Sequence, residues 1–236
     1  MKALILSDIH GNLPALEAIL QKERSFDTCL FLGDVVDYGP FPKECIRFLR
    51  EEMDVGVLGN HDNAIAHNVD CGCRGDFKQF SEETRAWHRT LLDEQDMRFL
   101  RSLPPLAQTH LDGGFVYLAH ATPQGDLFHY LQEEEVDQAV EGITAEVVLL
   151  GHTHIQFKKH VGRTLVVNPG SVGLARDGGN ACYAVLQDGS VVLRRIEYDV
   201  ERTIAALNRS PVSQTTKDAL GRILRGDKIE DIPACV

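Results

Sequence analysis

Residues 1–12 read MKALILSDIHGN, and this segment sets the pattern for the first half of the chain. An apolar run over residues 3–6 is followed at once by the polar residues Asp8 and His10. Asn12 is suited to cap a helix, because apolar residues recur after it at helical spacing. A strand that leads through a polar loop into a helix is the repeating unit of α/β proteins.

The same unit is repeated along the next forty residues or so. Apolar runs at 29–32 and 55–58 flank a helix expected over 42–52. This order of elements predicts a parallel sheet covered by helices. The other expected elements are two helices within 77–103 that break near 92–96, a helix at 133–141, strands at 106–111, 115–119, 147–150, 156–159, 164–167, 182–186 and 191–196, and two amphipathic helices after residue 199.

The composition is that of an ordinary globular protein. Of 236 residues, 43% are hydrophobic and 25% charged, which excludes a disordered, collagen-like or coiled-coil chain. No apolar run reaches the roughly 18 residues of a membrane helix, and the first residues lack the features of a secretory signal. We therefore expect a cytoplasmic protein whose six cysteines are reduced. We expect one domain over 1–236, with 199–236 as a C-terminal helical extension.

The net charge limits the possible partners. The formal charge is −11, which disfavours nonspecific binding to nucleic acids or to anionic membranes. A small phosphorylated substrate remains compatible with this charge, since bound cations outweigh the overall field locally. The sequence leaves the oligomeric state open.

Metal-binding residue types follow five of the predicted strands directly. In open α/β sheets, ligands bind outside the carboxyl ends of the strands, so these side chains are expected to meet. Imidazoles mixed with carboxylates and an amide suit Mn²⁺, Fe, Zn²⁺, Ni²⁺ or Co²⁺ better than Ca²⁺. Seven ligands are too many for one tetrahedral ion, but they fit two ions about 3.5–4 Å apart that promote displacement at phosphorus. The seven residues are Asp8, His10, Asp34, Asn60, His120, His152 and His154.

Taken together, these motifs resemble those of the calcineurin-like metallophosphoesterases, especially the small bacterial and archaeal phosphodiesterase-type branch. The resemblance covers 8–154 and extends to the loop NPGSVG at 168–173, whereas the tail after 199 carries no recognised motif. It implies a four-layer α-β-β-α sandwich of two mixed sheets flanked by helices. It also assigns one metal ion to Asp8, His10 and His154, the other to Asn60, His120 and His152, and both to Asp34 as a bridge.

The resemblance further implies catalytic and substrate-binding residues. His61 would protonate the leaving oxygen or donate a hydrogen bond to the phosphoryl group, and Asp37 would orient it. The protein-phosphatase branch has an arginine after this aspartate, whereas this chain has Tyr38-Gly39, which disfavours a protein phosphatase. Tyr38 and Arg176 are the residues that we expect to contact the substrate.

The expected reaction is metal-dependent hydrolysis of a phosphodiester or nucleotide-type substrate, with a hydroxide held between the metals as the nucleophile. The alternatives are a phosphomonoesterase, a dinucleoside-polyphosphate hydrolase and an interaction scaffold that kept only the fold. A DNA-processing nuclease is disfavoured by the acidic charge. Cys71 and Cys73 alone offer two metal ligands, so the simplest interpretation is a loop with free thiols. A redox pair and a loop over the cleft are the other interpretations.

Overall fold

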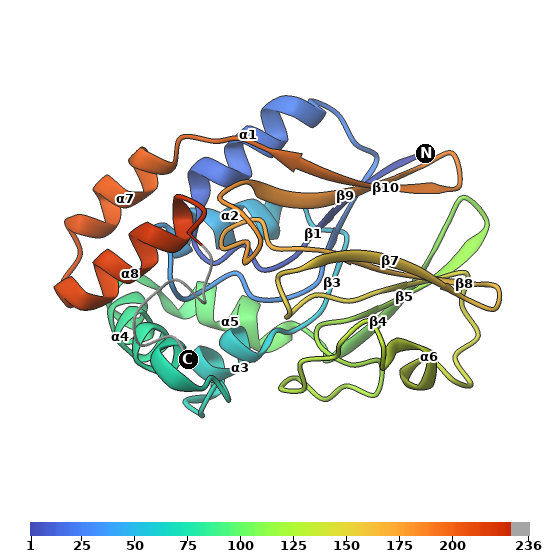
Figure 1. Ribbon diagram of the computed structural model, residues 1–236, viewed down its shortest axis with the longest axis horizontal. Helices are drawn as coiled ribbons and strands as arrows, with labels where there is room; N and C mark the ends of the chain where they lie inside the picture. The colour runs from blue at the N-terminus through green and yellow to red at the C-terminus, as the bar shows by residue number, and fades with distance from the viewer. Residues whose placement is uncertain (228–236) are drawn as a thin grey trace.

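The computed structural model describes residues 1–227, and two β-sheets form its centre (Figure 1). The first sheet has the spatial order β10-β9-β1-β2-β3, in which β1, β2 and β3 are parallel, and β9 runs antiparallel to β1 and to β10. Its strands are β1 (Lys2–Leu6), β2 (Thr28–Phe31), β3 (Val55–Gly56), β9 (Ala181–Gln187) and β10 (Ser190–Ile196).

The second sheet is also mixed. Its order is β4-β5-β6-β8-β7, in which β5, β6 and β8 are parallel and the edge strands β4 and β7 are antiparallel to their neighbours. Its strands are β4 (Leu106–Leu111), β5 (Gly114–Ala119), β6 (Val147–Leu149), β7 (Gln156–Val161) and β8 (Thr164–Pro169).

One apolar core lies between the two sheets. Ile5 and Leu30 of the first sheet belong to the same buried cluster as Leu118 and Leu149 of the second, and all four side chains are fully buried. The alternation of side chains along each strand leaves a second apolar face on the outside of each sheet, which helices must cover.

Helices cover both outer faces, although unequally. On the first sheet lie α1 (Leu13–Glu23), α2 (Pro42–Glu52) and α5 (Glu94–Ser102), which share a buried cluster with β1 and β2. On the second sheet the only helix within residues 1–227 is the short α6 (Val136–Ala139), whose Val136 joins the outer cluster of that sheet (Figure 1). The predicted α/β sandwich of two mixed sheets flanked by helices is confirmed.

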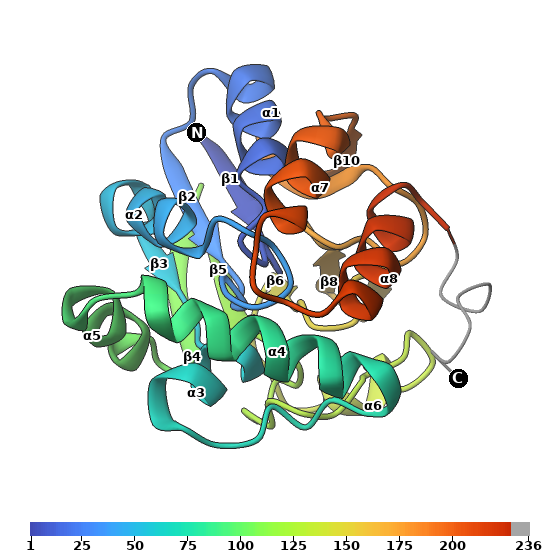
Figure 2. The same ribbon diagram turned by 90° about the vertical axis from the view of Figure 1, so that its left-hand side faces the viewer.

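Four more helices pack around one end of the sheets: α3 (Asn60–His67), α4 (Gly75–Leu91), α7 (Val200–Asn208) and α8 (Gln214–Leu224). Figure 2 shows α4 lying across this end, beside α3 and α8, while α7 lies next to α1. The two predicted amphipathic helices of the tail are therefore present, and they share a buried cluster with α3 and α4.

Several ends are shifted from the prediction by one or two residues, as at β7 and β8, and the differences at α3, β3 and α6 are the clearest. The helix α3 was not predicted, because its residues NHDNAIAH carry no apolar stripe. The strand β3 ends at Gly56 rather than 58, because the N–H of Leu58 donates to the carbonyl of Pro104 and no longer to the sheet. The helix predicted at 133–141 forms only over Val136–Ala139.

The five cysteines within residues 1–227 are free and buried, and Cys235 lies outside the described residues, as does the end of the predicted helical extension. In the described part of the chain, none of the helices combines the length and the apolar character that crossing a lipid bilayer requires.

Candidate metal centre

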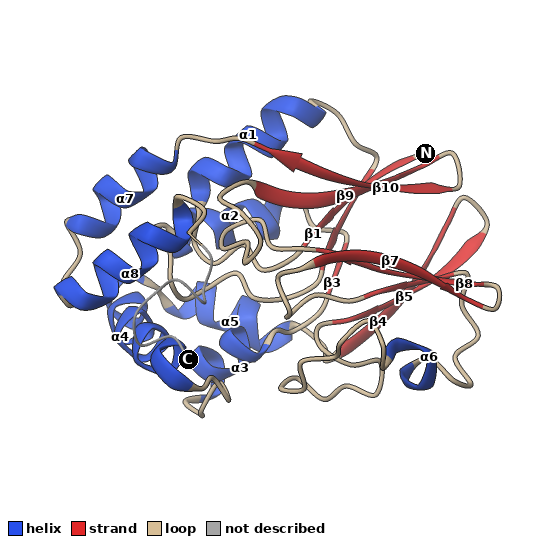
Figure 3. Ribbon diagram, in the orientation of Figure 1, coloured by secondary structure: helices blue, strands red, loops and turns tan. Residues whose placement is uncertain are grey.

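All seven predicted metal ligands follow the carboxyl ends of strands, and their side chains lie close together. Figure 3 shows loops between the strands and the helices at this end of the sheets. Each of the seven ligands is at most 3% exposed. Buried polar groups need partners, so such a concentration of them indicates either a dense hydrogen-bond network or a bound ion. Five of the seven adopt left-handed backbone conformations, with φ between 46° and 65°: Asp8, His10, Asp34, His152 and His154.

The first group of ligands comprises Asp8, His10 and His154. Nε2 of His154 lies 3.1 Å from Oδ1 of Asp8, and Nε2 of His10 lies 3.8 Å from the same oxygen. A backbone carbonyl oxygen on the side away from Asp8 fixes the orientation of each ring. Nδ1 of His10 lies 2.7 Å from the carbonyl oxygen of Val36, and Nδ1 of His154 lies 2.6 Å from that of Leu174.

These contacts leave acceptor atoms facing each other. A carbonyl oxygen only accepts, so each Nδ1 carries the hydrogen and each Nε2 of the neutral ring carries a lone pair. The two Nε2 atoms of His10 and His154 are nevertheless only 3.1 Å apart, and Oδ1 of Asp8 has no hydrogen-bond partner. Burial, with the neighbouring His154, lowers the pKa of His10 to about 3, so this ring is neutral. A cation between these atoms would satisfy all three.

The second group contains Asn60, His120 and His152. The amide nitrogen of Asn60 donates to the carbonyl oxygen of Cys71 at 2.7 Å. This hydrogen bond orients the amide so that Oδ1 of Asn60 points toward the two histidines. Nε2 of His120 and Nδ1 of His152 lie 3.0 and 3.1 Å from that oxygen. Nδ1 of His120 lies 2.7 Å from the carbonyl oxygen of Leu32, which directs its Nε2 into the site, and Nε2 of His152 is buried without a hydrogen-bond partner among the described residues.

Asp34 lies between the two groups. Its Oδ2 is 3.2 Å from Nε2 of His120, and its Oδ1 accepts the backbone N–H of His61 at 2.8 Å. A carboxylate oxygen of Asp34 lies within 4.8 Å of a ring nitrogen of His10. One of its oxygens also lies within this distance of ring nitrogens of His120 and His152. Burial opposes charge on His120, yet the Asp34 carboxylate raises the pKa of that histidine to about 9. The position between two imidazole groups is the one expected of a bridging carboxylate.

His61 and Asp37 form a hydrogen-bonded pair beside this centre. Nδ1 of His61 lies 2.7 Å from Oδ2 of Asp37, and Nε2 of His61 lies 4.0 Å from Oδ2 of Asp34. Burial disfavours the charged imidazole, but the carboxylates of Asp34 and Asp37 outweigh it and raise the pKa of His61 to about 8. The protonated form therefore exists near neutral pH, with Nε2 directed at the metal ligands.

Arg85 of α4 is a part of the site that the sequence did not reveal. Its Nε donates to Oδ2 of Asp37 at 3.0 Å, and its Nη2 also donates to that oxygen. The arginine is 7% exposed, and together with His61 it lowers the pKa of Asp37 against the effect of burial. Arg85 lies 48 residues from Asp37 in an amphipathic helix, so no spacing rule connects the two.

Tyr38 and Arg176 both lie at the site. The hydroxyl of Tyr38 is 3.4 Å from Nε2 of His61. The guanidinium of Arg176 lies over the rings of Phe77 and Tyr130, at 5.0 and 5.3 Å, and its Nε has no hydrogen-bond partner. The ring of Tyr130 in turn packs on His152, with centroids 4.1 Å apart. A cationic side chain with an unused donor is thus held above the second ligand group.

Asp62 organises the loop that carries these ligands, a role that its sequence motif alone does not indicate. Its Oδ2 accepts the N–H of Asp34 at 2.7 Å, and its Oδ1 accepts the N–H of Val35 at 2.9 Å. Burial, followed by repulsion from Asp34, raises the pKa of Asp62 to about 7. Gly59, three residues earlier, must also lack a side chain for Asp34 to keep its position, because a Cβ atom at Gly59 would collide with the carboxylate of Asp34.

We expect Asp62→Ala to lower the free energy of unfolding by about 3 kcal/mol, since each buried N–H left without an acceptor costs roughly 1–3 kcal/mol. Denaturant unfolding of the metal-free protein measures this change. Asp62→Asn keeps one acceptor oxygen and should lose less. Equal stability of Asp62→Ala and the unchanged protein would show that the loop does not depend on this carboxylate.

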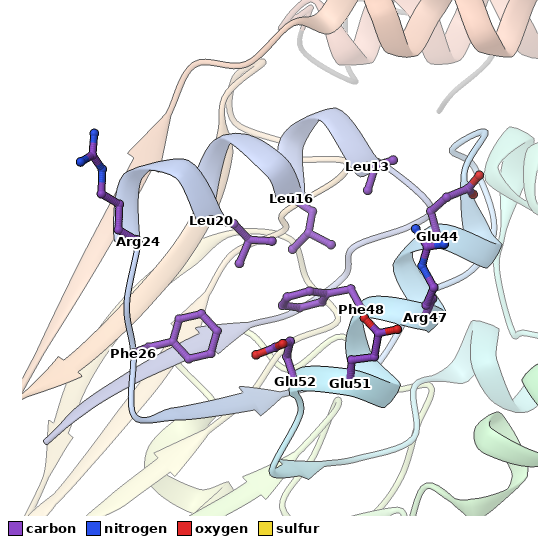
Figure 4. Close-up of a pocket in the computed structure, with 10 residues that line it drawn as sticks. All are labelled: Leu13, Leu16, Leu20, Arg24, Phe26, Glu44, Arg47, Phe48, Glu51 and Glu52. Atoms are coloured by element: carbon purple, nitrogen blue, oxygen red, sulfur yellow. The ribbon is translucent and has the colours of Figure 1, made fainter.

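A separate surface pocket lies between α1 and α2 (Figure 4). Its floor is apolar, with Leu16 and Leu20 of α1 facing Phe48 of α2, and Glu51 and Arg47 lie at its edge. None of the residues that line this pocket belongs to the metal centre or to the His61 pair.

Comparisons with known proteins agree with this arrangement. A family model described as calcineurin-like phosphoesterase superfamily domain matches residues 1–188, which include every site residue described above. Uncharacterized protein MJ0912 of Methanocaldococcus jannaschii is 30% identical, covering 92% of this chain and 97% of that protein. Phosphodiesterase YfcE of Escherichia coli is 26% identical over 91% of this chain and 97% of its own length. The crystal structure of a metallophosphoesterase from Sphaerobacter thermophilus is 26% identical, with a TM-score of 0.80 over 93% of this chain and 98% of that chain.

Proposed function

Because this chain belongs to the calcineurin-like phosphoesterase superfamily and is therefore a hydrolase of phosphate esters, we propose that it cleaves small phosphodiesters with the help of two divalent metal ions. The observation that supports two ions is that each ligand group contains buried ring nitrogens whose hydrogen-bonding needs the protein does not meet. In the first group Nε2 of His10 faces Nε2 of His154 at 3.1 Å, and in the second group Nε2 of His152 has no hydrogen-bond partner in the described part of the chain. Asp34 between the two groups would contact both ions.

The donor set fits Mn²⁺, Fe, Zn²⁺, Ni²⁺ or Co²⁺, because it consists of imidazole nitrogens with carboxylate and amide oxygens. Asp8, His10 and His154 would hold one ion, and Asn60, His120 and His152 the other. When bound, such ions supply a water of lowered pKa and stabilise negative charge on the phosphoryl oxygens. No sulfur atom belongs to either group.

The chain itself supplies the proton for the leaving group. His61 presents Nε2 to the centre, and Asp37 at Nδ1 fixes the ring and stabilises its charged form. Arg85 holds Asp37 in place from the other side. A general acid works best when its pKa lies near the working pH, and a pKa of about 8 meets this condition for His61.

Asp37→Asn is expected to move the basic limb of the pH–rate profile to lower pH by about one unit, because an adjacent opposite charge shifts a pKa by roughly 1–3 units. The active form of His61 is protonated, so activity falls as the pH rises through its pKa. Removing the carboxylate lowers that pKa, and the decline must begin earlier. Profiles of kcat/KM measured on both proteins test this, and an unmoved basic limb would contradict the role of Asp37.

A small substrate suits the surroundings of the site. Tyr38, Tyr130 and Arg176 lie over the centre and offer one cationic group with a free donor. The net charge of −11 disfavours binding along a nucleic acid, which depends on many cationic contacts. We therefore propose a nucleotide-sized phosphodiester as the substrate, and direct contacts of Tyr38 and Arg176 with it.

A substrate panel tests the proposal. The Mn²⁺-loaded protein is assayed with bis-p-nitrophenyl phosphate, p-nitrophenyl phosphate and diadenosine tetraphosphate. The proposal expects the diester to give the highest kcat/KM. A preference for the monoester would make the protein a phosphomonoesterase, and a preference for the polyphosphate would make it a dinucleoside-polyphosphate hydrolase. No hydrolysis of any of the three would favour a scaffold that kept only the fold.

A further inference from the structure

We propose that Cys71, Cys73 and His61 form a third metal site, which takes a thiophilic cation such as Zn²⁺ and thereby removes His61 from catalysis. The binding of the cation is independent of the function proposed above. Only the resulting inhibition rests on it.

The three donor atoms are already close together. Sγ of Cys71, Sγ of Cys73 and a ring nitrogen of His61 all lie within 4.8 Å of one another. Sγ of Cys73 is 3.5 Å from Nε2 of His61. Zinc binds sulfur at about 2.3 Å and nitrogen at about 2.0–2.1 Å, so tetrahedral geometry places these two donors about 3.5 Å apart. The pair of Cys73 and His61 is therefore already at the spacing of two zinc ligands, and Sγ of Cys71 lies within 4.8 Å of both.

The loop between α3 and α4 is built to direct both thiols inward. The carbonyl of Cys71 accepts from the amide of Asn60 at 2.7 Å, and the N–H of Gly72 donates to Asp70 at 2.6 Å. Gly72 has a φ of 75°, and a Cβ atom there would lie 2.7 Å from the ring of Phe128. The positive φ favours glycine at this turn, and the thiols on either side of it both lie near His61.

The surroundings suit a metal with three protein ligands. Cys71, Cys73 and His61 are only 2%, 6% and 4% exposed. The hydroxyl of Tyr38 lies 3.4 Å from Nε2 of His61 and 3.6 Å from Sγ of Cys73, so it borders the fourth coordination position. Structural zinc has four protein ligands, so a site with three protein ligands and one open position is not of the structural type.

The pair formed by His61 and Asp37 completes the arrangement. Histidines that bind metals commonly donate their second ring N–H to a carboxylate, which fixes the tautomer. Nδ1 of His61 lies 2.7 Å from Asp37, so Nε2 is the free ligand atom. On binding, the cation displaces the protons of the two thiols and the proton of Nε2. The proton that the leaving group needs is then absent.

The choice of ligands separates this site from the proposed dinuclear centre. Thiolates select Zn²⁺ or Cu⁺ over Mn²⁺ and Mg²⁺. The seven ligands of the dinuclear centre include no sulfur, and Cys29, Cys45 and Cys182 belong to neither group. Within residues 1–227, sulfur in the coordination shell of a bound metal therefore reports on the Cys71–Cys73 site, and its loss in variants of these two cysteines assigns it there.

X-ray absorption at the zinc edge provides the direct test. One equivalent of Zn²⁺ is added to the Mn²⁺-loaded full chain under a reductant that does not bind metals. We expect a shell of two sulfur atoms at about 2.3 Å and a nitrogen at about 2.0 Å. The Cys71→Ser/Cys73→Ser variant should lose the sulfur shell, Cys73→Ser alone should keep one sulfur, and the matched control Cys182→Ser should keep both. Zinc bound only through nitrogen and oxygen in the unchanged protein would overturn the site.

Inhibition is measured on the same proteins, each against its own rate without Zn²⁺. Loss of an outer-shell partner alone weakens metal binding roughly 10–100-fold, so loss of both thiolates should raise the half-inhibiting Zn²⁺ concentration by at least about 100-fold. A sulfur shell without inhibition would overturn the effect on His61. If no substrate of the panel is hydrolysed, the proposed function fails, while the sulfur shell still decides whether the site exists.

Discussion

Asp34→Asn is expected to lower turnover by more than about 10³-fold, because removing even one electrostatic contact to the transition state costs roughly 10²–10³-fold. Asp34 lies between the two ligand groups, with Oδ2 3.2 Å from Nε2 of His120. An amide in its place carries no charge, so both ions should bind more weakly. Activity and metal content of the purified protein are to be measured together.

This substitution leaves the local backbone in place. Asparagine tolerates the φ of 65° at Asp34 and keeps the oxygen that accepts the N–H of His61. Asp188→Asn is the matched control, because this exposed residue also has a positive φ, 51°, and lies in the turn between β9 and β10. Full metal content and activity in Asp34→Asn would remove Asp34 from the bridging position.

His61→Ala is expected to slow turnover by about 10²–10⁴-fold, the usual contribution of a positioned general acid, and to leave the metal content unchanged. The side chain of His61 contacts Asp37 and faces the centre, but it belongs to neither ligand group of the proposed dinuclear site. Steady-state rates and metal analysis of the same preparation separate the two effects.

The leaving group distinguishes a proton donor from a residue that only positions others. p-Nitrophenolate leaves readily without a proton, so the loss caused by His61→Ala should be smaller for p-nitrophenyl esters than for esters of ordinary alcohols. His160→Ala, a change at an exposed histidine of β7, serves as the control. An equal loss with both kinds of ester, or loss of the metals, would show that His61 has a different role.

The sequence predicted the sheets and the ligands for the same physical reason. Each ligand motif follows an apolar run that had to be a buried strand, and parallel strands bring their carboxyl ends to one edge. Asp8 after β1 and Asp34 after β2 could therefore be placed together before any contact was known. The chain is folded as this pattern predicted, and the catalytic and metal-binding roles of these residues remain proposals for the experiments above.

The parts that could not be predicted depend on contacts between side chains of distant elements. Arg85 occupies an ordinary position of an amphipathic helix, and only the packing of α4 brings it to Asp37. The helix α3 has no apolar stripe, because its first residues serve the site rather than the core. The thiols of Cys71 and Cys73 lie in a loop whose path is set by Gly72 and by the amide of Asn60.

Anomalous diffraction from crystals of the Mn²⁺-loaded protein is the most direct measurement of the metal centre. The proposed dinuclear site predicts two peaks about 3.5–4 Å apart, the separation typical of two-metal hydrolases. One peak should lie against His10 and His154, the other against His120 and His152, with Asp34 between them. A single peak, or two peaks away from these side chains, would contradict it.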